Sequence, residues 1–290
     1  MINKLIKCAN HLDLLKYESN DNDKDKKLNF AKFCFDEDAD EIGGYEQPKQ
    51  FEKVTNDNLS GKLKVLGQLL RTWRLQPNSR ILVFSHYTRI LDIIEKYLDR
   101  QGMTNCRIDG SVTAAKRAQI VDDFNNLNKN NFVFLISTKA GGLGLNLTAA
   151  NIVILFDSNW NPSCDSQAQD RAYRLGQQRN VDVYRLISTG TIEDKVYCRQ
   201  LYKMQLSSDA LEGNSEDRFF EGVQGLKSHQ GELFGIKNLL EYDSDGHMLK
   251  LQRIVDTPKD IATSETLKAA SLLANKSNNF TVQQALDKCL

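Results

Sequence analysis

Two arginines stand three positions apart in QAQDRAYRLGQ, the segment from Gln167 to Gln177. If this segment is helical, Arg171 and Arg174 lie one turn apart on the same face. Each guanidinium is permanently charged and offers a planar fork of N–H donors, so the pair can grip the charge that builds on a phosphoryl group during transfer. Gln167 and Asp170 extend the same polar stripe. A solvated, salt-bridged face is the alternative, but the segment follows a strand end, where ligands bind in parallel sheets.

A glycine-rich turn between two apolar runs is a second candidate for anion binding. The turn contains Ser137, Thr138, Lys139, Gly141, Gly142 and Gly144. Glycines let backbone N–H groups approach an anion closely, while the hydroxyls and the lysine add donors and charge. Leu147 occupies the place of the third glycine of GxGxxG, so a dinucleotide site is not expected. A plain tight turn is the alternative.

A tryptophan, an asparagine and a proline follow the next apolar run as WNP at 160–162. Trp160 is expected just past the carboxyl end of a strand, and Pro162 suits the first turn of the following helix. In that position the indole can stack or wedge against a nucleic acid. A core position is the alternative, and it is the commoner one for a single tryptophan.

The sequence lacks the residue patterns that other kinds of catalytic or metal site require. The sequence has no GxxxxGK[ST] phosphate loop, and its acidic run DEDADE lies in a charged tract where a Mg²⁺-binding strand-end acid is not expected. The four histidines have no metal-ligand spacing, and no GxSxG occurs, so zinc sites and hydrolase triads are poor interpretations. We therefore expect no metal site of the chain's own, and a nucleotide site only with the help of another lobe.

The composition predicts a soluble intracellular protein with one main domain. Lys+Arg and Asp+Glu number 38 each, so no overall field attracts nucleic acid and any such contact must be local. Six cysteines without a CxxC pair fit a reducing compartment. No apolar run reaches the ~18 residues of a membrane span, so no membrane partner is expected.

Helices and strands alternate from Ser60 onward, and this alternation positions the candidate residues. The strands are expected at 81–86, 104–108, 132–137, 151–156 and 181–187, and the helices at 60–76, 88–100, 113–126, 163–175 and 191–206. Short connections imply right-handed βαβ crossovers, so the predicted fold class is α/β, with a parallel sheet sandwiched by helices. Residues 1–16 are expected to form one amphipathic helix.

The chain resembles the second RecA-like lobe of Swi/Snf-type ATPases, superfamily-two helicase relatives that translocate along duplex DNA. Four ordered motifs carry the resemblance, which covers roughly residues 1–206. They are ILVFSHYTRILDIIEKYL, RIDGSVTAAKRAQIVDDFN, STKAGGLGLNLTAANIVILFDSNWNP and QAQDRAYRLGQQRNVDVYRL. The resemblance implies a RecA-like α/β lobe of the P-loop NTPase type that lacks the P-loop itself.

The resemblance also implies roles for individual residues. Arg171 and Arg174 match arginine fingers that reach ATP, which the first lobe would hold together with Mg²⁺. Gln167, Asp170 and Gly144 would support that cleft. The implied DNA-binding residues are Ser85, Thr138, Lys139, Gly141, Gly142 and Trp160.

The resemblance divides the chain into segments. They are a helix from the end of a missing first lobe at 1–17, a charged linker at 18–58, the lobe at 59–206, a Hebo-type extension at 207–242 and a mobile tail at 243–290. FFEGVQGLKSHQGELFGIKNLL in the extension is most similar to the Cockayne-syndrome-B-like, Hebo-type DNA repair branch. That branch implies a nuclear location, with duplex DNA and a first lobe in cis or trans as partners, and chromatin or repair proteins bound through 207–242.

Other functions stay open at the level of sequence. The chain is expected to be a fragment of a longer DNA-dependent ATPase and inactive alone. It could instead be an ATP-independent module that binds DNA or protein. An RNA helicase lobe is a weaker alternative, because the GLGLN and DRAYRLGQ strings are similar to the duplex-DNA branch.

Overall fold

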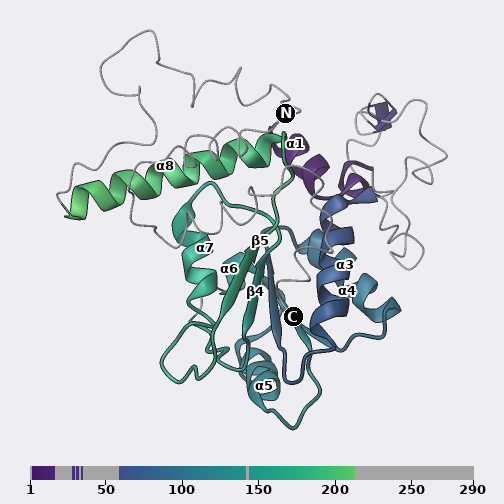
Figure 1. Cartoon of the computed structure of the whole chain (residues 1–290). Helices are drawn as coiled ribbons and strands as arrows, with labels where there is room; N and C mark the ends of the chain where they lie inside the picture. Colours follow the sequence, from purple (N-terminus) through teal and green to yellow (C-terminus); the bar gives the residue numbers. More distant parts are fainter. Residues whose placement is uncertain are drawn as a thin grey trace. The chain divides into compact units, whose positions relative to one another are not determined.

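The computed structural model describes residues 2–16, 28–29, 31–32, 34, 59–141 and 144–212, and Figure 1 draws the other residues as a thin grey trace. The chain divides into two compact units. The first unit holds the sheet and comprises chiefly Asn3–Asp157 and Ser163–Leu186. The second comprises chiefly Ser158–Pro162 and the chain from Ile187 onward, which includes helix α8, Ile192–Glu212. The segments predicted at 18–58, 207–242 and 243–290 lie mostly outside the described residues.

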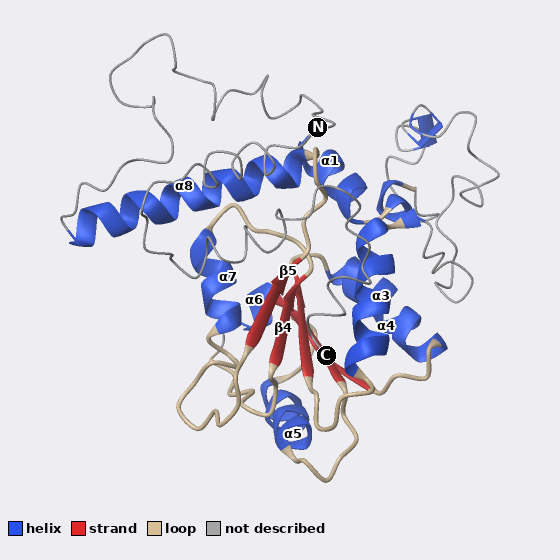
Figure 2. Cartoon of the chain, in the orientation of Figure 1, coloured by secondary structure: helices blue, strands red, loops and turns tan. Residues whose placement is uncertain are grey.

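A five-stranded parallel sheet forms the centre of the first unit (Figure 2). Its strands are β1 Ile81–Ser85, β2 Asn105–Ile108, β3 Val133–Ser137, β4 Ile152–Leu155 and β5 Asp182–Arg185, in the order β2-β3-β1-β4-β5. Every residue of β1, β3 and β4 is buried, as continuous apolar runs predict for strands covered on both faces. The predicted α/β fold is confirmed. Because all strands are parallel, their carboxyl ends meet at one edge of the sheet.

Helices cover both faces of this sheet. Helices α5, Ala114–Asn125, α6, Thr138–Gly141, and α7, Pro162–Gln169, contribute Phe124, Ala140 and Ala168 to one continuous apolar core with the strands. Helix α4, Thr88–Arg100, contacts β1, β2 and β3. The chain runs outward from β1 to β2 through α4 and back to β3 through α5, so right-handed crossovers put α4 and α5 on opposite faces.

Helix α3, Gly61–Trp73, packs beside α4. The Arg71 guanidinium donates a hydrogen bond to the Tyr97 hydroxyl of α4 at 3.2 Å. The Trp73 ring lies 4.9 Å, centroid to centroid, from Tyr184 of β5. The helix is predicted to run to 76 but ends at Trp73, whose buried side chain packs against the sheet.

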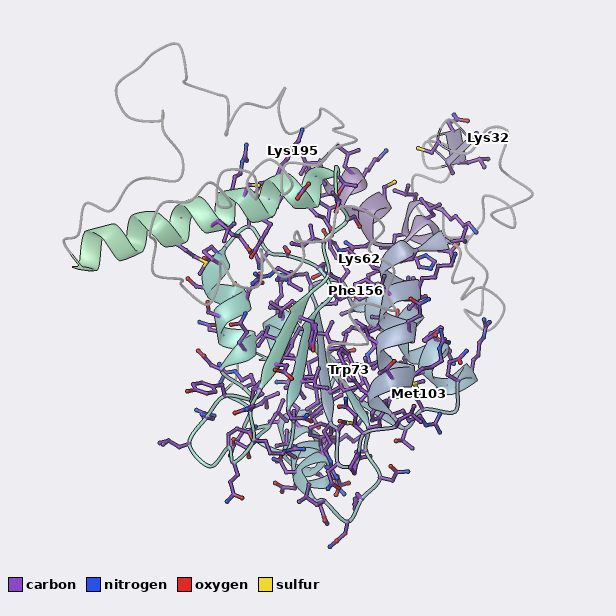
Figure 3. All side chains as sticks on the ribbon, viewed as in Figure 1. Lys32, Lys62, Trp73, Met103, Phe156 and Lys195 are labelled. Atoms are coloured by element: carbon purple, nitrogen blue, oxygen red, sulfur yellow. The ribbon has the colours of Figure 1, made fainter. Side chains whose placement is uncertain are left out.

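The N-terminal segment is anchored by buried polar side chains. Helix α1, Ile2–Asn10, leads into a 3-10 turn, η1, Leu12–Leu15. Ser60 Oγ donates to the Asn10 carbonyl at 2.6 Å, and Lys62 Nζ donates to Asn10 Oδ1 at 2.9 Å and to the Phe156 carbonyl at 2.8 Å. The Lys62 ammonium also lies 5.5 Å from the centroid of the Phe156 ring, and Figure 3 labels both side chains. Lys62 therefore ties residues 2–16 to the end of β4.

Some predicted elements differ from those observed. The helix predicted at 163–175 ends at Gln169, so its last turn and a half is wrong. The single helix predicted at 1–16 breaks at His11, whose backbone is extended and whose Nδ1 accepts a hydrogen bond from the Asp13 N–H. Helix α8 continues past its predicted end at 206, to Glu212.

Candidate functional site

Asp157 joins the ends of two central strands. The Ser85 hydroxyl, at the end of β1, donates to Asp157 Oδ2 at 2.6 Å, and the His86 N–H donates to Asp157 Oδ1 at 2.9 Å. The same Ser85 oxygen accepts a hydrogen bond from the Tyr87 N–H at 3.1 Å. Ser85 and Asp157 are buried, at 0% and 3% exposure. The carboxylate thus shapes this edge of the sheet, and the Ser85 hydroxyl, predicted to contact DNA, is engaged inside the lobe.

The short helix α6 begins directly after β3 and presents the next predicted residues. Ser137 Oγ accepts a hydrogen bond from the Ala140 N–H at 3.3 Å, which turns the chain as it leaves the strand. Thr138 is half-buried and Lys139 is exposed. Gly141 ends the helix, and Gly142 lies outside the described residues. Lys139 therefore offers a cation to solvent near the carboxyl end of β3.

Both candidate arginines meet the loop that follows Gly144. Arg174 Nη1 donates to the Gly144 carbonyl at 2.9 Å and to the Leu145 carbonyl at 3.4 Å. The Arg171 carbonyl accepts a hydrogen bond from the Leu147 N–H at 3.0 Å, and a Cβ built on Gly144 would lie 3.9 Å from Arg171 Nη1. Gly144 has φ +76°, a conformation that residues with side chains rarely adopt. The structure therefore brings Arg171, Arg174 and Gly144 together.

The arginines do not lie on a helix, contrary to the prediction. Helix α7 ends at Gln169, and the chain then turns back toward the 144–150 loop instead of continuing its helical rise. Gln177 Nε2 fixes this return by donating to the Ala150 carbonyl at 2.7 Å and to the Ala172 carbonyl at 3.1 Å. The Arg174 guanidinium and the Arg171 backbone are therefore placed by contacts between two loops.

The other two candidate residues of this segment, Gln167 and Asp170, are close to the arginines in sequence, and both are exposed. Gln167 lies on α7, and Asp170 follows the helix end. Arg174 is exposed, whereas Arg171 is half-buried. Nε of Arg171 is buried and has no hydrogen-bond acceptor among the described residues. A guanidinium with an unused donor beside a glycine loop is suited to an anionic ligand.

Trp160 belongs to the second unit. Its indole is half-buried, so the predicted core alternative is only partly right. The Arg199 guanidinium of α8 lies 5.6 Å from the centroid of the indole. Lys203 Nζ donates to the Trp160 carbonyl at 3.2 Å, and Gln200 Nε2 donates to the Asn159 carbonyl.

Comparison with known proteins gives consistent matches. The helicase conserved C-terminal domain family matches residues 61–176. Switch 2 of Arabidopsis thaliana is 46% identical over 271 residues, which are 93% of this chain and 31% of that protein. DNA excision repair protein ERCC-6-like 2 of Mus musculus is 44% identical over 248 residues, which are 84% of this chain and 16% of that protein. The C-terminal part of the Fun30 ATPase domain, a solved structure, matches with TM-score 0.55 and 32% identity over 69% of this chain and 71% of that one.

The chain belongs to the helicase C-terminal domain family of Swi/Snf-type ATPases. The predicted family is thereby confirmed, and the relatives that match include proteins named as ATPases. The ISWI chromatin-remodeling complex ATPase ISW2 of Saccharomyces cerevisiae, at 41% identity over 192 residues, is a further relative. The chain spans less than a third of the length of the curated relatives Switch 2 and ERCC-6-like 2, at 31% and 16%.

Several residues that build this Swi/Snf-type lobe were not predicted. Asp157 could have been found, because it is an acid directly after a buried apolar strand. Asn125 of α5 holds the glycine loop from the other side, donating to the Asn146 carbonyl at 2.8 Å and accepting from the Ala149 N–H at 3.3 Å. Asp165 of α7, 2% exposed, pairs with Arg185 of β5 at 3.5 Å. The last two pairs join distant segments, and no local pattern marks them.

Two further findings, on metal sites and on membrane spans, concern only the residues that the structure describes. Among these residues no three His, Cys, Asp or Glu side chains gather as a metal ion would require. No helix in the same ranges is both long enough and apolar enough to cross a membrane.

Proposed function

We propose that this Swi/Snf-type lobe supplies two arginines to ATP held by another lobe and grips duplex DNA with residues at its strand ends. The observation that carries the proposal is the meeting of Arg171 and Arg174 at the Gly144 loop. Two permanent positive charges at one loop suit an anionic ligand such as a polyphosphate. The sequence contains no phosphate loop, so the other half of the site would come from a first lobe in cis or in trans.

The donor groups fit phosphate oxygens. Arg174 is exposed, and the acceptors it now uses are the neutral carbonyls of Gly144 and Leu145. A phosphate oxygen carries negative charge and a carbonyl oxygen does not, so a phosphate would compete with these carbonyls for the Arg174 guanidinium. The unused Nε–H of Arg171 could be satisfied at the same time. Bound ATP supplies the phosphoryl group, and Mg²⁺, held mainly by the other lobe, neutralises charge on it.

The remaining cleft residues would position the arginines. The positive φ of Gly144 turns its carbonyl toward Arg174, which keeps that side chain ordered before ATP arrives. Gln167 and Asp170, both exposed, would support the cleft from either side of the end of α7. The loop contact would keep the guanidinium at the cleft in the absence of ATP, and a phosphate would replace that contact on binding.

DNA contacts would come from the edge formed by β3 and from Trp160. Thr138 and Lys139 offer a hydroxyl and an exposed ammonium, and Gly141 with Gly142 would let the DNA backbone approach closely. Ser85 would act through Asp157, because its hydroxyl is already donated to that carboxylate. Contacts of this kind address phosphates, so binding would be independent of sequence and sensitive to salt.

The relatives support a proposal about process and partners. Alignment with Switch 2 and with ERCC-6-like 2 covers 93% and 84% of the chain and so extends beyond the helicase C-terminal match. We therefore keep the Cockayne-syndrome-B-like, Hebo-type branch, with a nuclear location and a role in DNA repair or chromatin remodelling. In this proposal the chain consists of a helix from a first lobe at 1–17, a linker at 18–58, the lobe at 59–206 and an extension at 207–242. Chromatin or repair proteins would bind through the extension.

The test is ATP hydrolysis with and without duplex DNA. The chain is assayed alone and mixed with the first lobe of a relative such as Switch 2, and also covalently joined to that lobe. Arg174→Ala and Arg171→Ala are the test variants. Arg100→Ala, which removes an exposed guanidinium at the end of α4, is the matched control. An arginine finger contributes about 10³- to 10⁵-fold in rate, so either test variant should lose nearly all turnover.

The outcomes separate the proposed function from its alternatives. Turnover that needs both lobes and DNA, that is kept in Arg100→Ala and that is lost in Arg171→Ala and Arg174→Ala supports the arginine fingers. Turnover that persists in Arg174→Ala and Arg171→Ala overturns them. Duplex binding without ATPase activity in the joined protein would point to an ATP-independent binding module, and selective binding of RNA would point to an RNA helicase lobe.

A further inference from the structure

Helix α8 holds the Trp160 loop through three side chains from a single turn. Gln200 donates to the Asn159 carbonyl, Lys203 donates to the Trp160 carbonyl at 3.2 Å, and the Arg199 guanidinium faces the indole at 5.6 Å. Lys203 is four positions from Arg199 and three from Gln200, the spacings at which helical residues are neighbours on one face, so the three groups reach the loop together. Residues 158–162 accordingly cluster with α8 in one compact unit, although they follow β4 directly in the chain.

These contacts fix both the backbone and the ring of the tryptophan. Two carbonyl groups are bonded to α8, so the peptide planes before and after Trp160 Cα have a defined direction. Arg199 then covers one part of the half-buried indole by a cation–π contact and leaves the rest accessible. Burial lowers the pKa of Arg199, but a guanidinium remains charged at any physiological pH.

We infer that Arg199, Gln200 and Lys203 are positioning residues, which set the orientation in which Trp160 meets duplex DNA. The inference rests on the proposed DNA role of Trp160. An indole that wedges against a base step must have a defined ring orientation. A mobile side chain would have to be ordered on binding, and this would lower the affinity. Helix α8 would supply that order in advance.

The first experiment asks whether α8 holds the ring. The chain has two tryptophans, and Trp73 is 2% exposed, so a neutral quencher such as acrylamide reports chiefly on Trp160. Arg199→Ala should raise the quenching constant, and Arg199→Lys, which keeps a cation, should restore most of the protection. Arg100→Ala is the control for loss of an arginine. If Arg199→Ala perturbs folding by circular dichroism, the exposed Lys203→Ala variant tests the same loop. Unchanged quenching in folded variants of both positions would overturn the inference.

The second experiment asks whether the orientation matters for DNA. Binding of a short fluorescein-labelled duplex to the full chain is measured by anisotropy at one salt concentration. Losing a cation–π contact should weaken binding by about two- to fivefold, and Arg199→Lys should recover it. In a Trp160→Ala background, Arg199→Ala should have no further effect, because it acts through the ring. An equal loss in that background would mean that Arg199 touches DNA itself, and would overturn the positioning role.

The two proposals fail in different ways. If Trp160→Ala leaves duplex binding unchanged while Arg199→Ala still exposes the indole, the proposed DNA role of Trp160 is wrong, and the orientation set by α8 serves no DNA contact. If Trp160→Ala weakens binding but neither Arg199→Ala nor Lys203→Ala alters quenching or affinity, only the positioning role is wrong.

Discussion

Acidification should weaken the N-terminal anchoring of the lobe through His11. This imidazole is 1% exposed, and its Nδ1 accepts a hydrogen bond from the Asp13 N–H at 3.1 Å. Lys16 Nζ lies 2.6 Å from Asp13 Oδ1 in the same buried cluster. Burial, and next the charge of Lys16, lower the pKa of His11 from 6.5 to about 4. Folded His11 is therefore neutral at pH values where the unfolded histidine is protonated.

The sign and the size of the effect follow from this difference. Between pH 6.5 and about 4 the unfolded state binds more protons, so the free energy of unfolding falls as the pH falls. The loss from His11 is about 2 kcal/mol between pH 7 and pH 5, and about 3 kcal/mol by pH 4. Burial raises the pKa of Asp13, although its hydrogen bond and ion pair with Lys16 oppose this. Asp13 therefore offsets part of the loss at the acid end.

The assay is urea unfolding at pH 7 and pH 5, followed by tryptophan fluorescence, with amide hydrogen exchange of residues 2–16 to detect local release. His11→Gln is the comparison, because glutamine can still accept a hydrogen bond but does not titrate. Asp13 and Lys16 are present in both proteins, so the difference between their pH dependences reports chiefly on the replacement of His11. The variant should lose about 2 kcal/mol less than the native chain on acidification. Equal losses in both proteins would refute the argument.

Further perturbations test the packing and the DNA-contact residues. In Gly67→Ala the new Cβ would lie 2.0 Å from the hydroxyl of buried Tyr97, so unfolding in urea should show a loss of about 1–3 kcal/mol, whereas Gly61→Ala, with nothing within 4 Å, should be neutral or slightly stabilising. Asp157→Ala removes the acceptor of the His86 N–H and of the Ser85 hydroxyl at the sheet edge and should cost about 1–3 kcal/mol by the same measurement. Lys139→Ala should lower the slope of log K for duplex binding against log salt by about 0.9, and an unchanged slope would remove Lys139 from the phosphate contacts.

The sheet could be predicted because its signals are local. A run such as ILVFS is apolar at every position, and only a strand covered on both faces buries all of it. Alternation of such runs with helical segments then fixes a parallel sheet and the edge where ligands bind. The same reasoning placed Thr138 and Lys139 at the end of β3, where the structure has them.

The placement of the arginines could be predicted only in part. Their position after β4 follows from the alternation, but the helical face expected for them does not exist. Beyond Gln169 the Arg171 carbonyl and the Gln177 side chain bond to the 144–150 loop, which is distant in sequence, and helix α7 does not continue. Helix propensity is weaker than such tertiary hydrogen bonds, so a local pattern overestimates the helix. The spacing of Arg171 and Arg174 nevertheless remains useful, since a turn brings both to the same loop.

Trp160 shows most clearly what a local pattern misses. Sequence alone offers two choices for an indole, a core position or a surface contact. The structure gives a third, in which side chains from a helix about 40 residues later hold the ring half-covered. Arg199 and Lys203 in the sequence are two cations on a helix, a pattern that usually means a solvated face. Only the fold reveals that Lys203 donates to a carbonyl and that Arg199 lies over an aromatic ring. The role of these two cations could therefore be inferred only from the structure.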